Sequence, residues 1–144
     1  MADVNQIADF IAKVPLYKGL RRRQLEGLAR TMVEQDYAAG QDIVTQGESG
    51  VGLFIIVTGT ADVVHVRTDG SKTVVNTFGP TDYFGELALL TEGPRTASVV
   101  AQEPTSCLVL TRWNFLAVLK GDAEMSISIL EELALRFRTA MAVM

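Results

Sequence analysis

Residues 84–99 read Phe-Gly-Glu-Leu-Ala-Leu-Leu-Thr-Glu-Gly-Pro-Arg-Thr-Ala-Ser-Val. This stretch sets one carboxylate, Glu86, nine residues before one guanidinium, Arg95, with a short apolar helical turn and a Gly-Pro break between them. A planar guanidinium binds phosphate better than an ammonium does, because it can donate two parallel hydrogen bonds. Backbone N–H groups at the start of a helix also attract anions. The pattern therefore predicts a site for a phosphorylated sugar.

The residues around Glu86 suit the sugar as well as the phosphate. Residues 87–90, Leu-Ala-Leu-Leu, can open a helix just after Gly85. Gly85 has no Cβ, so its backbone can approach a sugar closely, and the Glu86 carboxylate can accept a hydrogen bond from a ribose 2′-hydroxyl. The alternative is an ordinary strand-helix-strand crossing with one surface Glu and one surface Arg, which each residue taken alone would favour.

The composition predicts a globular chain with a real core. Of its 144 residues, 48% are hydrophobic and 21% are charged, which excludes a disordered chain. The net charge of −4 argues against nonspecific binding to nucleic acid, because such binding depends on Lys and Arg. A single cysteine, Cys107, excludes an internal disulfide. Since no secretory signal follows Met1 and no apolar run is long enough for a bilayer, we expect a cytoplasmic protein with no direct contact with nucleic acid or membrane.

The middle of the chain predicts strands, whereas both ends predict helices. Apolar residues recur at helical spacing from Val4 to Ile11, in a helix that we expect Pro15 to end, and a second helix is expected from Arg22 to Met32. Asp69-Gly70 predicts a hairpin. Short β-rich runs separated by glycines suggest a β-roll or jelly-roll barrel. The runs are Asp42–Thr45, Leu53–Thr58, Ala61–Arg67, Lys72–Phe78, Arg95–Ala101 and Thr105–Thr111.

Helical spacing returns near the C-terminus. A short helix is expected over Asn114–Lys120, broken at Gly121-Asp122, and a last helix over Ala123–Met144. The last helix carries apolar residues at alternating spacings of three and four, which form an a/d seam. The seam residues are Ile127, Leu130, Ala134, Phe137, Met141 and Met144. A second apolar set lies on another face, at Ile129, Leu133 and Ala140. Two apolar faces predict two contacts, one with the barrel and one with either a ligand lid or a partner helix.

The stretch at residues 84–99 resembles the phosphate-binding cassette of cyclic-nucleotide-binding domains. That family includes regulatory subunits of protein kinase A, cyclic-nucleotide-gated channels and bacterial catabolite activator proteins. Further stretches also look like this family: Val14-Pro15-Leu16-Tyr17, the turn around Gly40, Gln46-Gly47-Glu48, and the run Leu-Phe-Ile-Ile-Val-Thr-Gly at 53–59. The resemblance implies an α+β, mainly β fold: an eight-stranded β-roll at about 33–111, with N-terminal helices at about 3–32 and C-terminal helices at about 112–144, in one domain over 1–144.

The resemblance also implies the site. Arg95 becomes the phosphate clamp and Glu86 the ribose ligand. The other residues assigned to the ligand are Gly85, Leu87, Ala88, Thr96, Ala97, Val74 and Val75, of which the two valines would wall the purine or else belong to the barrel core. Four residues of the last helix are candidates to cap the base: Leu130, Leu133, Arg136 and Phe137. The alternative is that they pack this helix against the barrel or against another helix.

Thr96 bears on the choice of base. Its hydroxyl could bond the 2-amino group of guanine, or equally the phosphate or its own backbone. Cyclic AMP is favoured, and cyclic GMP stays open. Two positions depart from the family pattern: Val51-Gly52 stands where an acidic-small pair is common, and Thr81 where glycine is usual. We expect both to lie outside the phosphate contacts.

The function expected is that of a regulatory sensor without catalysis, cofactor or metal, which relays ligand binding through its C-terminal helix to an unknown effector. A homodimer could form through the terminal seam. The alternatives are the effector-sensing half of a Crp/Fnr-type transcription regulator whose DNA-binding domain is absent from this chain, an enzyme that uses the barrel, and a module that has lost its ligand. A cupin-like metal enzyme needs several histidines, whereas His65 is the only one, and Cys107 is expected to be an inert core residue.

Overall fold

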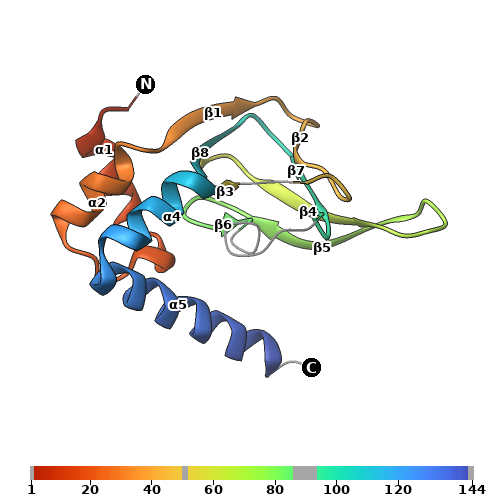
Figure 1. Cartoon of the computed structure of the whole chain (residues 1–144). Coiled ribbons are helices and arrows are strands. Elements are labelled where there is room, and N and C mark those ends of the chain that lie inside the picture. Colours follow the sequence, from red (N-terminus) through yellow and green to blue (C-terminus); the bar gives the residue numbers. More distant parts are fainter. Residues whose placement is uncertain (1, 50–51, 86–93, 143–144) are drawn as a thin grey trace. The chain divides into compact units, whose positions relative to one another are not determined.

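The computed structural model describes residues 2–49, 52–85 and 94–142 (Figure 1). The chain divides into two compact units. One is helical and contains Met1–Thr31 and Trp113–Met144, and the other contains the strands and spans Met32–Arg112. Among the described helices, none combines the length and the apolar character that a membrane span requires.

The N-terminal part of the helical unit contains α1 (Val4–Ile11), the 3₁₀ turn η1 (Pro15–Tyr17) and α2 (Arg22–Ala29). The expectation that Pro15 ends the first helix is wrong: the helix ends at Ile11, and Pro15 opens η1, where its fixed φ suits the first position. The second helix also ends before Met32. Thr31 N and Thr31 Oγ1 both bond the Leu28 carbonyl, at 3.0 and 2.7 Å, which tightens the last turn and stops the helix.

The C-terminal part contains α4 (Arg112–Gly121) and α5 (Ala123–Met141), and the expected break lies between them. Asp122 caps α5, because its carboxylate accepts hydrogen bonds from Met125 N and Gln24 Nε2, both at 2.9 Å. These two bonds, the first above all, lower the pKa of Asp122 below its ordinary value. Asp122 therefore begins α5 and also ties it to α2.

The two apolar faces of α5 have different environments. Met125 and Ile129 are buried and Leu133 is half-buried, on a helix that packs against η1. Ala140, which was assigned to the same face, is exposed. The seam residues Ile127, Leu130, Phe137 and Met141 remain between 48% and 65% exposed.

The strand unit is the expected β-roll of jelly-roll type. Within the described residues it has eight strands in two antiparallel four-stranded sheets, ordered β1-β8-β3-β6 and β2-β7-β4-β5, and the sheets do not close into one hydrogen-bonded barrel. The strands are β1 (Val33–Tyr37), β2 (Asp42–Val44), β3 (Gly52–Thr58), β4 (Ala61–Val66), β5 (Lys72–Phe78), β6 (Tyr83–Phe84), β7 (Ser98–Ala101) and β8 (Thr105–Thr111).

The hairpin expected at Asp69-Gly70 joins β4 to β5, which Figure 1 shows running side by side. Its pairing is not regular, because Val63 faces Asn76 while Val64 faces Val74. Val75 is thus an extra residue on β5, a bulge that interrupts the alternation of side chains. Val74 and Val75 are 57% and 58% exposed, so the alternative that they belong to the barrel core is wrong.

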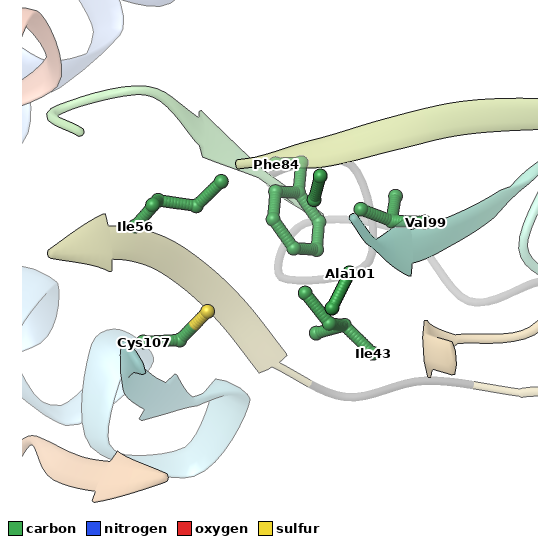
Figure 2. Close-up of a cluster of buried hydrophobic side chains, with 7 residues drawn as sticks. Ile43, Ile56, Phe84, Val99, Ala101 and Cys107 are labelled. Carbon is green, nitrogen blue, oxygen red and sulfur yellow. The ribbon is translucent and has the colours of Figure 1, made fainter. Parts of the chain in front are cut away.

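A cluster of buried apolar side chains joins the two sheets (Figure 2). One sheet contributes Ile56, Phe84 and Cys107, and the other contributes Ile43, Ala61, Val99 and Ala101. Cys107 is fully buried, and this burial, with a smaller effect of the Asp36 charge, raises the pKa of its thiol to about 12. Cys107 is therefore a core side chain that remains a neutral thiol at physiological pH.

Candidate ligand-binding site

The backbone of Arg95 is fixed by the loop that follows β2. Arg95 N donates to the Glu48 carbonyl, and Gly47 N donates to the Arg95 carbonyl, each at 2.9 Å. Ser49 forms an antiparallel bridge with Pro94 next to this pair. The loop therefore sets where the Arg95 side chain begins.

Gln46 fixes that loop to both neighbouring strands. Its side-chain amide exchanges two hydrogen bonds with the backbone of Val66, at 2.7 and 2.9 Å, as a neighbouring strand would. Its backbone N–H donates to the Ser98 hydroxyl at 2.8 Å, and Ser98 is buried. The support for Arg95 thus extends from the end of β4 to the start of β7.

The Arg95 side chain is half-buried and lies against β3. Its Nη2 donates to the Gly52 carbonyl at 3.1 Å. Its guanidinium carbon lies over the ring of Phe54, 5.8 Å from the centroid. Gly52 itself is buried and paired with Thr111 in the β3–β8 ladder, so the accepting carbonyl has a fixed position.

Gly85 lies directly beside this contact. A Cβ at Gly85 would lie 2.5 Å from the Gly52 carbonyl oxygen and 2.8 Å from Arg95 Nη1, both too short for any side chain. Its φ is +88°, a conformation that glycine adopts readily. The missing side chain at Gly85 therefore makes room for the guanidinium.

A pocket of about 320 Å³ opens beside Arg95. This volume lies at the lower end of the range for small-molecule sites. Its wall includes Gly52 and Phe54 together with the polar residues Thr45, Glu48 and Ser49. Arg95 thus combines a fixed cationic group with space for a small ligand.

A family model described as "Cyclic nucleotide-binding domain" matches residues 34–122. The chain belongs to the cyclic nucleotide-binding domain family. It is also similar to solved structures. The N-terminal domain of a transcriptional regulator from Streptomyces coelicolor is 27% identical, with a TM-score of 0.83 and 94% of each chain covered.

Two larger proteins are similar over part of their length. The catabolite activator protein of Thermus thermophilus is 30% identical, with a TM-score of 0.80 over 89% of this chain and 60% of that one. A regulatory subunit of a cAMP-independent protein kinase A from Trypanosoma cruzi, bound to guanosine, is 33% identical, with a TM-score of 0.72 over 78% of this chain and 40% of that one. The chain thus spans 60% or less of these two relatives.

In this cyclic nucleotide-binding domain, the structure brings together two of the residues assigned to the ligand, Gly85 and Arg95. Thr96 and Ala97 follow Arg95 directly and are exposed and half-buried, respectively. Glu86, Leu87 and Ala88 lie outside the described residues. The roles of all these residues at the ligand remain predictions.

The two valines of β5 are placed by the strand register. Val74 faces Val64, and Val64 faces Ser98 on its other side. Val74 is therefore two strands away from Ser98, roughly 10 Å by the usual spacing of strands. The valines are exposed, and they lie in the same sheet as β7, the strand that follows Arg95.

The cap candidates belong to the helical unit. On α5, Leu130 and Phe137 are 57% and 65% exposed, and Leu133 and Arg136 are half-buried. Their role as a base cap remains a prediction.

The sequence alone did not indicate the residues that surround the Arg95 side chain. In the sequence, Phe54 is only part of a predicted strand and Gly52 only a departure from the family pattern, whereas in the structure the Gly52 carbonyl accepts a hydrogen bond from Arg95. Gln46, Gly47 and Glu48 look like the family, but the resemblance alone indicates no role for them. A glycine at the start of a strand was the available signal, because it often marks a close approach of another group.

His65 lies exposed on β4. Within the described ranges, no three His, Cys, Asp or Glu side chains lie close enough together to bind a metal ion.

Proposed function

We propose that the chain binds a cyclic purine nucleotide, cyclic AMP in preference to cyclic GMP, and acts as a regulatory sensor module without catalysis or cofactor. The observation that carries this proposal is the Arg95 guanidinium, which donates a hydrogen bond to the Gly52 carbonyl, lies over the Phe54 ring and is accommodated by Gly85 at the edge of a pocket. Membership of the cyclic nucleotide-binding domain family supports it.

The phosphate is the part of the ligand that Arg95 would bind. A cyclic phosphodiester carries one negative charge, and a guanidinium has five N–H donors, enough to bind two phosphate oxygens while one donor bonds Gly52. Backbone N–H groups of Gly85, Ala88, Thr96 and Ala97 complete the proposed phosphate site, with Leu87 in the same turn. Glu86 would accept a hydrogen bond from the ribose 2′-hydroxyl, a group that AMP shares, so selectivity for the cyclic ligand comes from the phosphate end.

The base would pack on β5. Val74 and Val75 expose more than half of their surface, and covering apolar side chains with a flat purine is favourable. Thr96 would distinguish the bases if its hydroxyl bonded the guanine 2-amino group. Leu130, Leu133, Arg136 and Phe137 are the proposed cap.

Regulation would use α5. A ligand shifts an equilibrium only if it binds two states with different affinity, so the proposed cap must contact the ligand in one state more than in the other. In the state in which Leu130 and Phe137 do not cover the base, the exposed seam of α5, with Ile127, Leu130, Phe137 and Met141, would pair with the same seam of a second copy. The cytoplasmic location and the lack of direct contact with nucleic acid or membrane remain predictions.

A second candidate is the sensing half of a transcription regulator. The Streptomyces coelicolor domain, which is the N-terminal domain of such a regulator, matches this chain over 94% of both lengths. A regulator that reads a two-fold symmetric operator acts as a dimer. A ligand-dependent dimer would therefore favour this candidate, and a monomer with bound ligand would favour a sensor that regulates a partner protein.

Calorimetric titration of the purified chain tests the proposal. Cyclic AMP, cyclic GMP, AMP and guanosine are titrated in parallel, and guanosine is included because a similar protein is known in complex with it. We expect a Kd of about 1 μM or tighter for one cyclic nucleotide, no binding of AMP, and an unchanged ligand after long incubation when analysed by chromatography. Absence of binding to both cyclic nucleotides would refute the proposal, and guanosine alone would point to a nucleoside sensor.

A further inference from the structure

We infer that Phe54 is a positioning residue, which holds the Arg95 guanidinium in the orientation that a phosphate requires. The inference rests on the proposed function, in which Arg95 binds the phosphate of a cyclic nucleotide. Phe54 lies outside residues 84–99, so its role is one that this stretch does not supply.

The guanidinium of Arg95 lies over the Phe54 ring with 5.8 Å between its central carbon and the ring centroid. This distance is within the range of about 6 Å in which a cation is attracted by the negative face of an aromatic ring. Arginine gains more from this geometry than lysine, because its planar group can stack on the ring while its edge donates hydrogen bonds. One such bond goes to the Gly52 carbonyl.

The Phe54 ring is itself fixed by an aromatic stack. Phe54 stacks on Phe84, with centroids 5.2 Å apart and planes 4° apart. Phe84 stacks in turn on Phe78, at 5.5 Å and 3°. The three rings come from β3, β6 and β5, so the stack includes strands of both sheets. Rotation of Phe54 away from Arg95 would therefore disrupt packing between the sheets.

Three different groups thus define the place of the guanidinium. The Phe54 ring lies beneath its central carbon, the Gly52 carbonyl accepts a hydrogen bond from its Nη2, and Gly85 leaves the space in which Nη1 lies. A long side chain confined in this way has fewer rotamers to lose when a ligand binds. Since ordering costs reduce affinity, Phe54 should increase the affinity of the site for an anion without contacting that anion.

The test compares ring variants of the full chain by calorimetric titration with the cyclic nucleotide that the wild type binds. Phe54→Leu removes the ring and keeps an apolar side chain, Phe54→Tyr keeps the ring, and Phe78→Leu removes the far ring of the same stack, which does not contact Arg95. From the range of cation–π energies we expect Phe54→Leu to weaken binding about 3- to 10-fold. Phe54→Tyr and Phe78→Leu should stay within about 2-fold of the wild type.

A purely structural role for Phe54 predicts a different pattern. The losses for Phe54→Leu and Phe78→Leu would then be equal, and that result would overturn the inference, as would wild-type affinity in Phe54→Leu. If Phe54→Leu does not fold, phenylalanines with increasing ring fluorination at position 54 decide the question, because fluorine weakens the ring's negative face with little change in size. A graded loss of affinity supports the inference, and a flat series refutes it.

The failure of this inference can be told from the failure of the proposed function. A wild-type chain that binds no cyclic nucleotide would refute the function. A wild-type chain that binds, with an affinity that is insensitive to ring electronics at position 54, would refute only the role of Phe54. In the ligand-free protein, the Arg95 Nε–H resonance should also move when the Phe54 ring is removed, because the ring current is lost.

Discussion

Thr81 adopts a backbone conformation that glycine adopts more readily. Its φ is +74°, at the third position of a turn in which Asp82 N bonds the Gly79 carbonyl at 3.0 Å. A type II turn requires positive φ at this position, and Pro80 fits the position before it. Two backbone bonds between the turn and Ile56 of β3, at 2.9 and 3.0 Å, keep the turn in place. The turn therefore imposes the strain on a β-branched residue.

Replacing Thr81 with glycine should stabilise the strand unit. The strain of a β-branched residue at positive φ costs about 1–3 kcal/mol, which exceeds the entropy that a glycine adds to the unfolded chain. We expect Thr81→Gly to raise the free energy of unfolding in urea by about 1 kcal/mol. Thr73→Gly, in the extended strand β5, is the control and should destabilise. Equal destabilisation by both changes would show that Thr81 is not strained.

Cys107 should make stability depend on pH in the alkaline range. Burial raises the pKa of its thiol from 9.0 to about 12, so the folded state retains a proton that the unfolded state loses. The stabilisation is fully present below about pH 9 and is lost as the pH rises toward 12. Burial also raises the pKa of Tyr37, so that residue acts in the same direction.

We therefore expect the unfolding free energy of the wild type to fall between about pH 9 and pH 10.5, and to fall less steeply in Cys107→Ala. Urea unfolding at a series of pH values measures both slopes. The smaller alanine side chain lowers the free energy of unfolding by the same amount at every pH, so it does not affect the slopes. Parallel curves for the two proteins would contradict the assignment.

For single residues, the sequence predicted those members of the site that lie close together along the chain. Arg95 and Gly85 were found because they belong to one continuous stretch, and the structure does bring them together. Phe54 and Gly52 could not be found in this way. They reach Arg95 only because β3 pairs with β6, which ends next to Gly85, and such a pairing depends on the whole sheet.

At the scale of elements, the turns of the strand unit differ in how much space they leave. Gly59, between β3 and β4, has φ +94°, and a Cβ there would meet Thr105 Oγ1 and lie 2.7 Å from the Pro104 carbonyl oxygen. Gly70, in the β4–β5 hairpin, has φ +87° but open space around it. A side chain at Gly70 would therefore meet backbone strain alone, whereas a side chain at Gly59 would meet both backbone strain and steric overlap.

Alanine at each position should show the difference. Gly70→Ala should cost about 1–2 kcal/mol, the price of a left-handed conformation for a residue with Cβ. Gly59→Ala should cost at least about 2 kcal/mol more, because the backbone of the Pro104–Thr105 segment must move as well. Thermal or urea unfolding measures both, and similar losses would mean that the Gly59 turn can relax without cost.

The elements that the sequence did not predict have little pattern of their own. β1 reads Val-Glu-Gln-Asp-Tyr and is largely exposed, so it lacks the alternation of a half-buried strand. β6 has two residues, and only its pairing with β3 defines it. In β5 the limits were predicted correctly, but the bulge at Val75 was not, because a bulge depends on the partner strand.

At the scale of the whole molecule, the exposed seam of α5 predicts self-association. Ile127 is 57% exposed at the N-terminal end of that seam, and a charge buried there without a partner is unfavourable. We expect light scattering of the wild type to give the mass of a dimer, and Ile127→Glu to give a monomer. Thr139→Glu, exposed but off the seam, should leave the dimer intact. A monomer throughout, with and without ligand, would exclude this interface.

Titration of Arg95→Ala is the sharpest test of whether Arg95 binds the phosphate of a cyclic nucleotide. Removing a charged hydrogen-bond partner should weaken binding by more than about 2 kcal/mol, or roughly 30-fold. Arg67→Ala, an exposed arginine just after β4, is the control and should bind as the wild type does. A folded Arg95→Ala protein with wild-type affinity would contradict the account.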